Sequence, residues 1–447
     1  MIGAGRAVAR IAAVALLLGA VASCAPSGGG GDGARLAVML QPGERPFWIP
    51  IAESFERAHP GVRVDLVEGP HATDLRENLY TASLLAGDPS FDLVYMDVTW
   101  TSKFAAAGWL RPLDDAFDAA ARERFLPVAL NAGFYRGRLY RIPVRTDVGV
   151  LYYRRDWLAE AGFEPPATFA ELTRIARALQ SPPGRWGFVW QGKQYEGLIC
   201  DFLEVLNGHG GFWIREGTLE VGLDRPEAEA ALAFLAGTCA GPDPISPPGV
   251  TTYQEEESRR LFQDGRAVFL RNWPYAWRLA QRDDSPLRGR VGVMPMVRAE
   301  GGRRAGTLGG WGLGVSAYSR RPELAIEFIH HATAMESQRA LCGPTGYAPA
   351  VRAAYDDPEL LEANPFLARL LDIHAQAVPR PIVARYALAS DILQRHLSAA
   401  LAGAETPAAA LAAAAFETRQ MLGTLERAAA DAPAPALAAT AAGGSAP

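Results

Sequence analysis

The sequence lacks the clusters of lysine and arginine that binding to nucleic acid would require. Its formal net charge is −5 at pH 7, and a mildly acidic surface without basic runs cannot neutralise a phosphate backbone. C-x-x-C and H-x-x-x-H spacings are also missing, and the chain contains only 4 cysteines. The sequence therefore predicts no metal site, no cofactor and no nucleic-acid partner.

Long apolar runs are scarce, and the one at the N-terminus is too short to span a bilayer. Residues 11–22 follow Arg6 and Arg10 and are typical of the apolar part of a secretory signal peptide. The run ends VASC at Cys24, as in bacterial lipoprotein signals, where the cysteine is lipidated after cleavage. We expect a signal peptide over 1–24, an anchor at Cys24 and an extracytoplasmic chain. The alternative is a plain secretory signal with an incidental cysteine.

The glycine-rich segment that follows, residues 25–34, predicts a flexible tether with nothing to pack. The three cysteines beyond it are Cys200, Cys239 and Cys342. An oxidising compartment permits a disulfide, and Cys200 with Cys239 is the favoured pair because both fall in predicted neighbouring helices.

A chain of 447 residues is too long to fold around one typical hydrophobic core, and this length suggests two or three domains. Hydrophobic residues make up 49% and charged residues 21% of the chain, as in soluble globular proteins. This composition argues against disorder and against multiple membrane spans.

Strands and helices alternate in the first third of the chain. Residues 35–41, 62–66 and 91–96 have strand patterns. Two helical stripes separate them: Trp48, Ile51, Ala52 and Phe55 in the first, and Leu75, Leu79, Ala82 and Ala86 in the second. This alternation predicts an α/β fold with a parallel sheet, in which ligands bind at the carboxyl ends of the strands. Asp97 follows the third of these strands.

The middle of the chain builds a second region. Strand patterns at 139–143 and 148–153 flank residues 145–147, and Thr168 with Glu171 forms a capping box that opens a helix. Strand character returns in the second half, so we expect several crossings between two lobes, a hinge, and a ligand in the cleft. We assign 35–146 and 266–310 to an N-terminal lobe, 147–265 and 311–427 to a C-terminal lobe, and 428–447 to a disordered tail.

Two aromatic segments have the composition of a sugar-binding surface. In residues 269–277, Pro274 is predicted to turn the chain out as a loop behind a rigid strand. In residues 309–314, glycines flank Trp311, which predicts a close approach of a ligand to the backbone beside an exposed indole. The alternative is that these rings belong to the core.

The chain beyond the signal peptide resembles the extracellular solute-binding proteins of bacterial sugar ABC transporters, and among them the trehalose/maltose type. The resemblance rests on segments spread over most of its length: 91–97 (FDLVYMD), 107–113 (AGWLRPL), 142–154 (IPVRTDVGVLYYR), 251–256 (TTYQEE), 271–277 (RNWPYAW), 309–311 (GGW) and 379–381 (PRP). It implies a two-lobed periplasmic-binding-protein fold of type II, capture of an α-linked disaccharide without catalysis, and a monomer. It also implies partners, namely an ABC permease and a separate ATPase subunit. No Walker sequence is present in the chain itself.

The resemblance also implies which residues contact the sugar. The predicted polar contacts are Glu44, Arg76, Asp97, Asp147 and Arg380, and the predicted stacking rings are Trp273, Tyr275 and Trp311. Charged groups suit this role because they make the stronger hydrogen bonds to hydroxyl groups. Arg385 competes with Arg380 for its role. One departure concerns Arg145, which stands where relatives have an aromatic residue and leaves the identity of the disaccharide open.

Two other functions remain as alternatives. Asp97, Asp147 and Glu255 could supply the paired carboxylates of a secreted glycoside hydrolase. The chain could also be a receptor for another solute, such as a different oligosaccharide, a polyamine or a glycerol phosphate diester. The aromatic segments argue against an anionic ligand.

Overall fold

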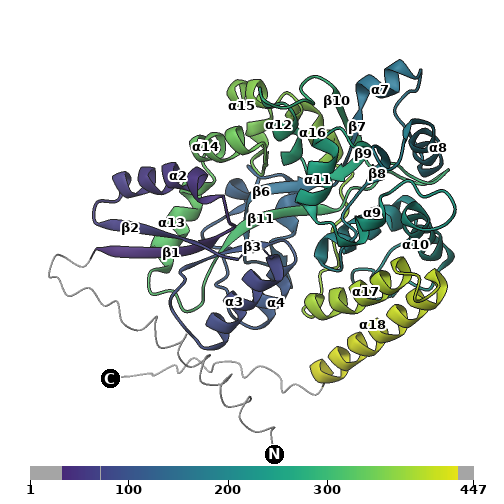
Figure 1. Ribbon diagram of the computed structural model, residues 1–447. Helices are drawn as coiled ribbons and strands as arrows, with labels where there is room; N and C mark the ends of the chain where they lie inside the picture. Colours follow the sequence, from purple (N-terminus) through teal and green to yellow (C-terminus); the bar gives the residue numbers. More distant parts are fainter. Residues whose placement is uncertain (1–32, 71, 431–447) are drawn as a thin grey trace, which may run out of the picture.

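The computed structural model describes residues 33–70 and 72–430 (Figure 1). The predicted signal peptide with Cys24, most of the tether and residues 431–447 lie outside them. Within the described residues, no helix has both the length and the apolar character needed to cross a membrane.

The first sheet has six strands in the order β12-β6-β11-β3-β1-β2. β1 is parallel to β2 and β3, whereas β11 runs antiparallel to its neighbours β3 and β6. The strands are β1 (Ala34–Leu40), β2 (Val62–Glu68), β3 (Leu93–Asp97), β6 (Ile142–Val148), β11 (Leu308–Val315) and β12 (Ala348–Pro349).

The second sheet has four strands in the order β10-β7-β9-β8. They are β7 (Val150–Arg154), β8 (Trp186–Val189), β9 (Ala267–Asn272) and β10 (Val291–Pro295). A small hairpin, β4 (Phe134–Tyr135) and β5 (Arg138–Leu139), stands apart from both sheets.

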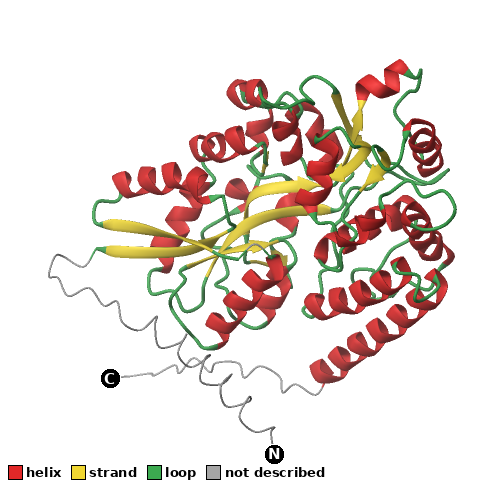
Figure 2. Ribbon diagram, viewed as in Figure 1, coloured by secondary structure: helices red, strands yellow, loops and turns green. Residues whose placement is uncertain are grey.

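Helices flank both sheets, which form the extended yellow strands in Figure 2. Around the first sheet they are α2 (Arg45–Ala58), α3 (Thr73–Leu85), α4 (Trp100–Ala106), α5 (Ala119–Arg122), α6 (Pro127–Asn131), α13 (Pro322–Ala332), α14 (Met335–Thr345), η2 (Arg352–Tyr355), α15 (Pro358–Ala363) and α16 (Leu367–His374). Around the second they are α7 (Arg155–Glu160), α8 (Phe169–Leu179), α9 (Glu196–Gly208), α10 (Pro226–Cys239), η1 (Pro248–Thr252), α11 (Glu255–Gln263), α17 (Tyr386–Leu401) and α18 (Pro407–Ala430). α12 (Tyr275–Ala280) follows β9 but packs against α14, and its buried residues Ala276 and Ala280 belong to the core of the first sheet. The predicted tail at 428–447 thus begins inside α18.

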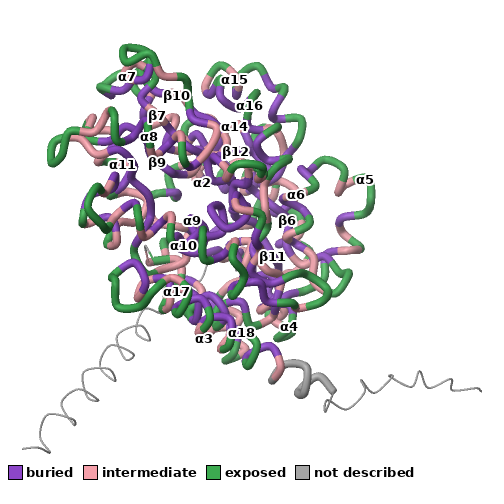
Figure 3. The backbone as a smooth tube through the Cα atoms, turned by 90° about the vertical axis from the view of Figure 1, so that its right-hand side faces the viewer, coloured by how far each residue is buried: buried purple, intermediate pink, exposed green. Residues whose placement is uncertain are grey.

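Two hydrophobic cores, one mainly at each sheet, hold these layers together, and the buried backbone is concentrated inside the molecule (Figure 3). The predicted stripe of α2 is confirmed, because Trp48, Ile51, Ala52 and Phe55 are all buried. The capping box at Thr168 is confirmed as well: its hydroxyl accepts from the backbone of Glu171, whose carboxylate accepts in return.

The predicted buried stripe of α3 is wrong by one position. Leu75 and Leu79 are 54% and 49% exposed, whereas Arg76, Tyr80 and Leu84 face inward. The physical reason is polar: the Tyr80 hydroxyl bonds to the backbone of β1 at Met39. Hydrophobic periodicity alone assigns an arginine to solvent and so selects the neighbouring stripe.

The predicted assignment of segments to lobes also needs correction. β9 and β10, in the segment 266–310, pair with β7 and β8 and not with the N-terminal strands. β11 starts within that segment but pairs with β3 and β6, and α13 packs against β11 and α2. The chain therefore returns to the first sheet at β11, which begins at Leu308, and not at the predicted residue 266.

The predicted disulfide does not form, because Cys200, Cys239 and Cys342 are all free thiols. The Cys239 thiol instead bonds to carbonyls of its own helix, at Leu235 and Ala236. Residues 145–147 are part of β6 and do not form a connection between strands.

Candidate functional site

Three crossovers join the two sheets and lie side by side. The first is at Gly149 between β6 and β7, the second leads from β10 into β11, and the third connects α16 to α17. Backbone hydrogen bonds join them: Gly149 N donates to Thr307 O at 3.2 Å, and Leu308 N donates to Val378 O at 2.8 Å. We call the region where these three segments meet the junction. The side chains around it come from both halves of the molecule, that is, from the elements around the first sheet and from those around the second.

Arg145 is the centre of one charged group at the junction. Its guanidinium pairs with Asp147 on the same strand and, at 3.3 Å, with Glu44 at the start of α2. Its Nε donates to the Tyr95 hydroxyl at 3.3 Å, and its Cζ lies 4.0 Å from the centre of the Tyr347 ring. All three charged residues are at most 6% exposed.

Arg380, in the third crossover, forms a second charged group with residues from both halves. It donates to Asp97 at the end of β3 at 2.9 Å and to Glu196 at the start of α9 at 2.7 Å. Glu196 also accepts from Ser390 and from the Tyr386 hydroxyl. Arg380 thus links the carboxyl end of the first sheet to the helices of the second.

Arg76 and Trp311 lie next to these groups. The Arg76 guanidinium is 4.9 Å from the centre of the Trp311 ring and donates to Pro70 O at 2.6 Å. Trp311 is 6% exposed and contacts the rings of Tyr95 and Trp100 at 5.2 and 5.4 Å. The expectation of an exposed indole on a loop is wrong: Trp311 lies within β11, and the glycines beside it let β6 approach.

Gly310 shows this close approach most clearly. It has φ +127°, and a Cβ placed on it would lie 2.7 Å from the carbonyl oxygen of Arg145. The glycine-rich sequence at 309–314 is therefore explained by strand packing.

Trp273 is half-buried and reaches the junction from the second sheet. A Cβ on Gly309 would lie 3.1 Å from its Cζ3 and 3.2 Å from the Cβ of Asp147, so the indole lies beside Asp147. Tyr275 differs, because its hydroxyl donates to Glu256 of α11 at 2.8 Å. Pro274 does not lead into an open loop but caps α12. The structure thus brings seven of the eight predicted residues together and leaves Tyr275 aside.

The site contains ionisable groups with shifted pKa values and buried polar atoms without a hydrogen-bond partner. Burial raises the pKa of the Asp147 carboxyl to about 6; Arg145 opposes this rise, and Glu44 and Asp97 add to it. Burial likewise raises the pKa of Glu196, against the effect of Arg380. Among the described residues, Oδ1 of Asp147 and Nε of Arg380 have no hydrogen-bond partner. An acceptor and a donor are therefore buried without a partner, which is costly unless a bound molecule supplies one.

The comparisons with known proteins agree with this architecture. The family model of bacterial extracellular solute-binding proteins matches residues 41–339. A probable ABC transporter-binding protein of Deinococcus radiodurans is 35% identical over 360 residues, which cover 78% of this chain and 84% of that protein. The chain belongs to the family of bacterial extracellular solute-binding proteins.

Similar proteins extend the comparison. The structure of maltose-bound T. maritima MalE3 is 38% identical and superimposes with a TM-score of 0.82, covering 87% of this chain and all of that one. A maltotriose-binding protein of Pyrococcus abyssi is 26% identical over 72% of this chain and 67% of its own length. The fold is therefore the two-lobed α/β fold of these binding proteins, and the family consists of binding proteins and not of enzymes.

The hydrolase alternative is contradicted by this family membership, and the geometry gives it no support. Asp97 is paired with Arg380, and Glu255 accepts from the indole of Trp273 at 3.4 Å. Within residues 33–70 and 72–430, no cluster of His, Cys, Asp and Glu could hold a metal ion.

This solute-binding protein also has a cavity of about 690 Å³ at the junction. Of the eight predicted residues, only Arg380 lines it. Leu308 lines it too, whereas the adjacent Gly309 faces Trp273 and Asp147. Because neighbouring residues of a strand project to opposite faces, the cavity lies on the other face of the junction from Trp273. Its lining is Val98, Thr99, Thr101, Ser102, Val128, Asn131, Ala132, Phe134, Tyr135, Arg136, Gly137, Glu216, Leu308, Pro379, Arg380, Pro381 and Ile382.

The prediction from sequence missed several members of the site. Glu196 carries no distinguishing signal, because an acidic residue in the first turn of a helix is ordinary. Tyr347 follows Gly346, a left-handed residue that ends α14, so its position could have been found from the helix stop. Arg145 was noticed only as a departure from the family pattern.

Proposed function

We propose that this protein is the substrate-binding lipoprotein of an ABC importer that captures an α-linked disaccharide of the maltose or trehalose type. Its lobes close on the sugar and deliver it to a membrane permease that works with a separate ATPase subunit. Glu44, Arg76, Asp97, Asp147 and Arg380 bind hydroxyl groups in this proposal, and Trp273 and Trp311 supply ring surfaces. Tyr275 is left out, because its hydroxyl bonds to Glu256.

One observation carries the proposal: buried carboxylates and guanidinium groups with unused polar atoms meet aromatic rings where the crossovers join. A sugar presents hydroxyl edges that pair with the charged groups and flat C–H faces that pack on the rings. The maltose named for T. maritima MalE3 and the maltotriose named for the P. abyssi protein support this ligand class.

Calorimetric titration against maltose, trehalose, sucrose, maltotriose and a glycerol phosphate diester tests the ligand class. We expect saturable binding of maltose or trehalose with a stoichiometry of one. Binding of the diester alone would refute the sugar assignment. Incubation with labelled maltose should leave the sugar intact, because nothing in the proposal requires turnover.

Lobe closure rests on the residues that Arg380 connects. Asp97 belongs to the first sheet and Glu196 to the helices of the second, so a ligand that contacts both groups stabilises the closed arrangement. Small-angle scattering should give a smaller radius of gyration in saturating maltose. An unchanged scattering curve at saturation would count against closure.

The anchor is proposed from the VASC sequence that ends at Cys24. The chain without residues 1–24 should be a soluble monomer, whereas the full chain should partition with membranes. A Cys24→Ser variant should lose that partitioning. A variant that is processed and membrane-bound like the parent would exclude lipidation at this residue.

A further inference from the structure

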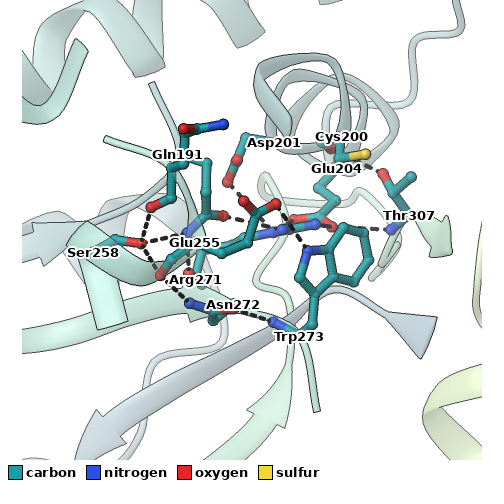
Figure 4. Close-up of polar contacts among 11 residues, drawn as sticks. Gln191, Cys200, Asp201, Glu204, Glu255, Ser258, Arg271, Asn272, Trp273 and Thr307 are labelled. Atoms are coloured by element: carbon teal, nitrogen blue, oxygen red, sulfur yellow. Dashed lines mark hydrogen bonds and ion pairs between the residues drawn. The ribbon is translucent and has the colours of Figure 1, made fainter. Parts of the chain in front are cut away.

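A third cluster of buried charges lies on the second sheet, around Arg271, two residues before Trp273. Arg271, in β9, is fully buried and pairs with Glu204 of α9, which is 1% exposed (Figure 4). Each of its three guanidinium nitrogens has a partner, since Nε and Nη2 donate to Glu204 and Nη1 donates to Gln191 at 3.0 Å. Asp201, one turn before Glu204, lies 3.4 Å from Nε.

Glu204 contacts two of the three crossovers. Its Oε1 accepts from the backbone N of Thr307 at 3.1 Å, and the Thr307 hydroxyl donates to Cys200 O at 2.9 Å (Figure 4). Gly149, in the first crossover, lies so close that a Cβ on it would overlap Oε1 of Glu204. Helix α9 is thereby fixed to the backbone at the junction.

Arg271 contacts the ring that the proposed function assigns to the ligand. Its Cζ lies 4.2 Å from the centre of the Trp273 ring. The Trp273 backbone N donates to Asn272 Oδ1 at 2.8 Å, and its indole donates to Glu255. One ion pair therefore touches the crossovers through its carboxylate and the ring through its guanidinium.

A buried ion pair is a weak source of stability, because desolvation offsets its attraction. Burial alone disfavours the charged form of Arg271, and the carboxylates of Glu204 and Asp201 reverse this and raise its pKa. Apolar residues of similar volume could fill the same space without loss of folding stability. The contacts of the pair with the crossovers and with Trp273 are therefore better explained by a role in positioning the ring.

We propose that Arg271 and Glu204 are positioning residues for ligand binding, which set the Trp273 ring at a fixed place relative to the crossovers. The inference rests on the proposed function only in taking Trp273 as a ligand-binding ring. With the pair intact, the Trp273 side chain is already held in one position before ligand binds. Binding then loses little conformational entropy at this ring.

The test replaces the pair by apolar residues of similar size. In Glu204→Leu/Arg271→Met we expect maltose affinity to fall by about tenfold or more, because the ring loses its support. The matched control is Arg154→Met/Asp156→Leu. It removes an ion pair at the end of β7, a strand of the same sheet. There Arg154 also lies against an indole, with its Cζ 3.6 Å from the centre of the Trp157 ring. In the described residues, its side chain has no contact with the crossovers. Control affinity should stay within about twofold of the parent.

A ligand-free readout accompanies the titration. Amide hydrogen exchange at Thr307 and Trp273 should be faster in Glu204→Leu/Arg271→Met than in the parent and the control. If the parent binds none of the sugars, the proposed function fails, and the exchange experiment still decides the positioning role. Parental exchange at both amides would overturn it.

Arg271→Lys covers the case in which the double variant does not fold. Lysine keeps the charge beside Glu204 but loses the planar fork that bonds two partners and stacks on the ring. Maltose affinity should fall by about threefold or more, and the emission of Trp273 should shift. Parental affinity together with parental emission in Arg271→Lys would refute the proposal.

Discussion

Trp273 and Trp311 have similar sequence surroundings and different structural ones. Both were predicted as exposed rings framed by glycine or proline. Trp311 lies within a strand of the first sheet, is 6% exposed and contacts two other rings. Trp273 follows the last residue of β9, stays half-buried and lies beside Asp147.

The difference shows that neighbouring glycines have two physical explanations. At Gly310 the space that a side chain would need is filled by the adjacent strand. At Gly309 it is filled in part by the Trp273 ring from the other sheet, 3.1 Å away. One ring therefore serves mainly the core, and the other lies where the two halves meet.

Trp311→Ala should have the largest effect. Removing a buried indole from a ring cluster leaves a cavity and should cost about 3 to 5 kcal/mol of unfolding free energy. Thermal or urea unfolding measures this loss. Leu85→Ala is the control, because that side chain is 73% exposed and its removal should leave stability nearly unchanged. A Trp311→Ala protein with parental stability would contradict the assignment of this ring to the core.

Trp273→Ala should lower affinity more than stability. An aromatic anchor typically costs more than about 2 kcal/mol on truncation, which is roughly thirtyfold in the dissociation constant for maltose. Trp157→Ala is the matched control, since that indole is also half-buried and also lies against an arginine, Arg154. Among the described residues, its ring contacts do not include those of the junction. A large fall in melting temperature with parental affinity would place Trp273 in the core with Trp311.

Asp147 provides a smaller, pH-dependent comparison. Its carboxyl, which faces Arg145, Glu44 and Asp97, has a raised pKa of about 6, so it gains a proton as the pH falls below that value. The ionised form accepts two hydroxyl donors, and maltose affinity should therefore fall by about tenfold per pH unit below 6. Titrations at pH 7.5, 6 and 5 measure this. Asp147→Asn should bind more weakly with a flatter profile, and an equally steep profile would assign the dependence to another group.

The sequence was sufficient for much of the fold, because periodicity reports burial faithfully where the buried residues are apolar. The stripe of α2 and the capping box of α8 were both predicted from pattern alone. Asp97 was placed correctly at the carboxyl end of β3 by the rule that governs ligand sites in parallel sheets.

Prediction failed where polar contacts between distant segments determine the structure. Arg76 faces inward because its guanidinium meets the Trp311 ring and the Pro70 carbonyl, neither of which periodicity can anticipate. The pairing of Arg380 with Glu196 joins residues 184 positions apart. Strand order likewise depends on long-range pairing, and for that reason β9 and β10 were assigned to the wrong half and the predicted boundary at residue 310 divided β11.

We expect ligand to bind on the side of the junction where Trp273 and Asp147 lie, and not in the cavity on the opposite face, which shares only Arg380 with the eight predicted residues. Calorimetric titration of maltose into Asp147→Asn and Glu216→Gln, side by side with the parent, tests it most directly. Glu216 lines the cavity and has no part in the charged groups. The account predicts at least about tenfold weaker binding for Asp147→Asn and parental binding for Glu216→Gln. Parental affinity in Asp147→Asn together with a loss in Glu216→Gln would contradict it.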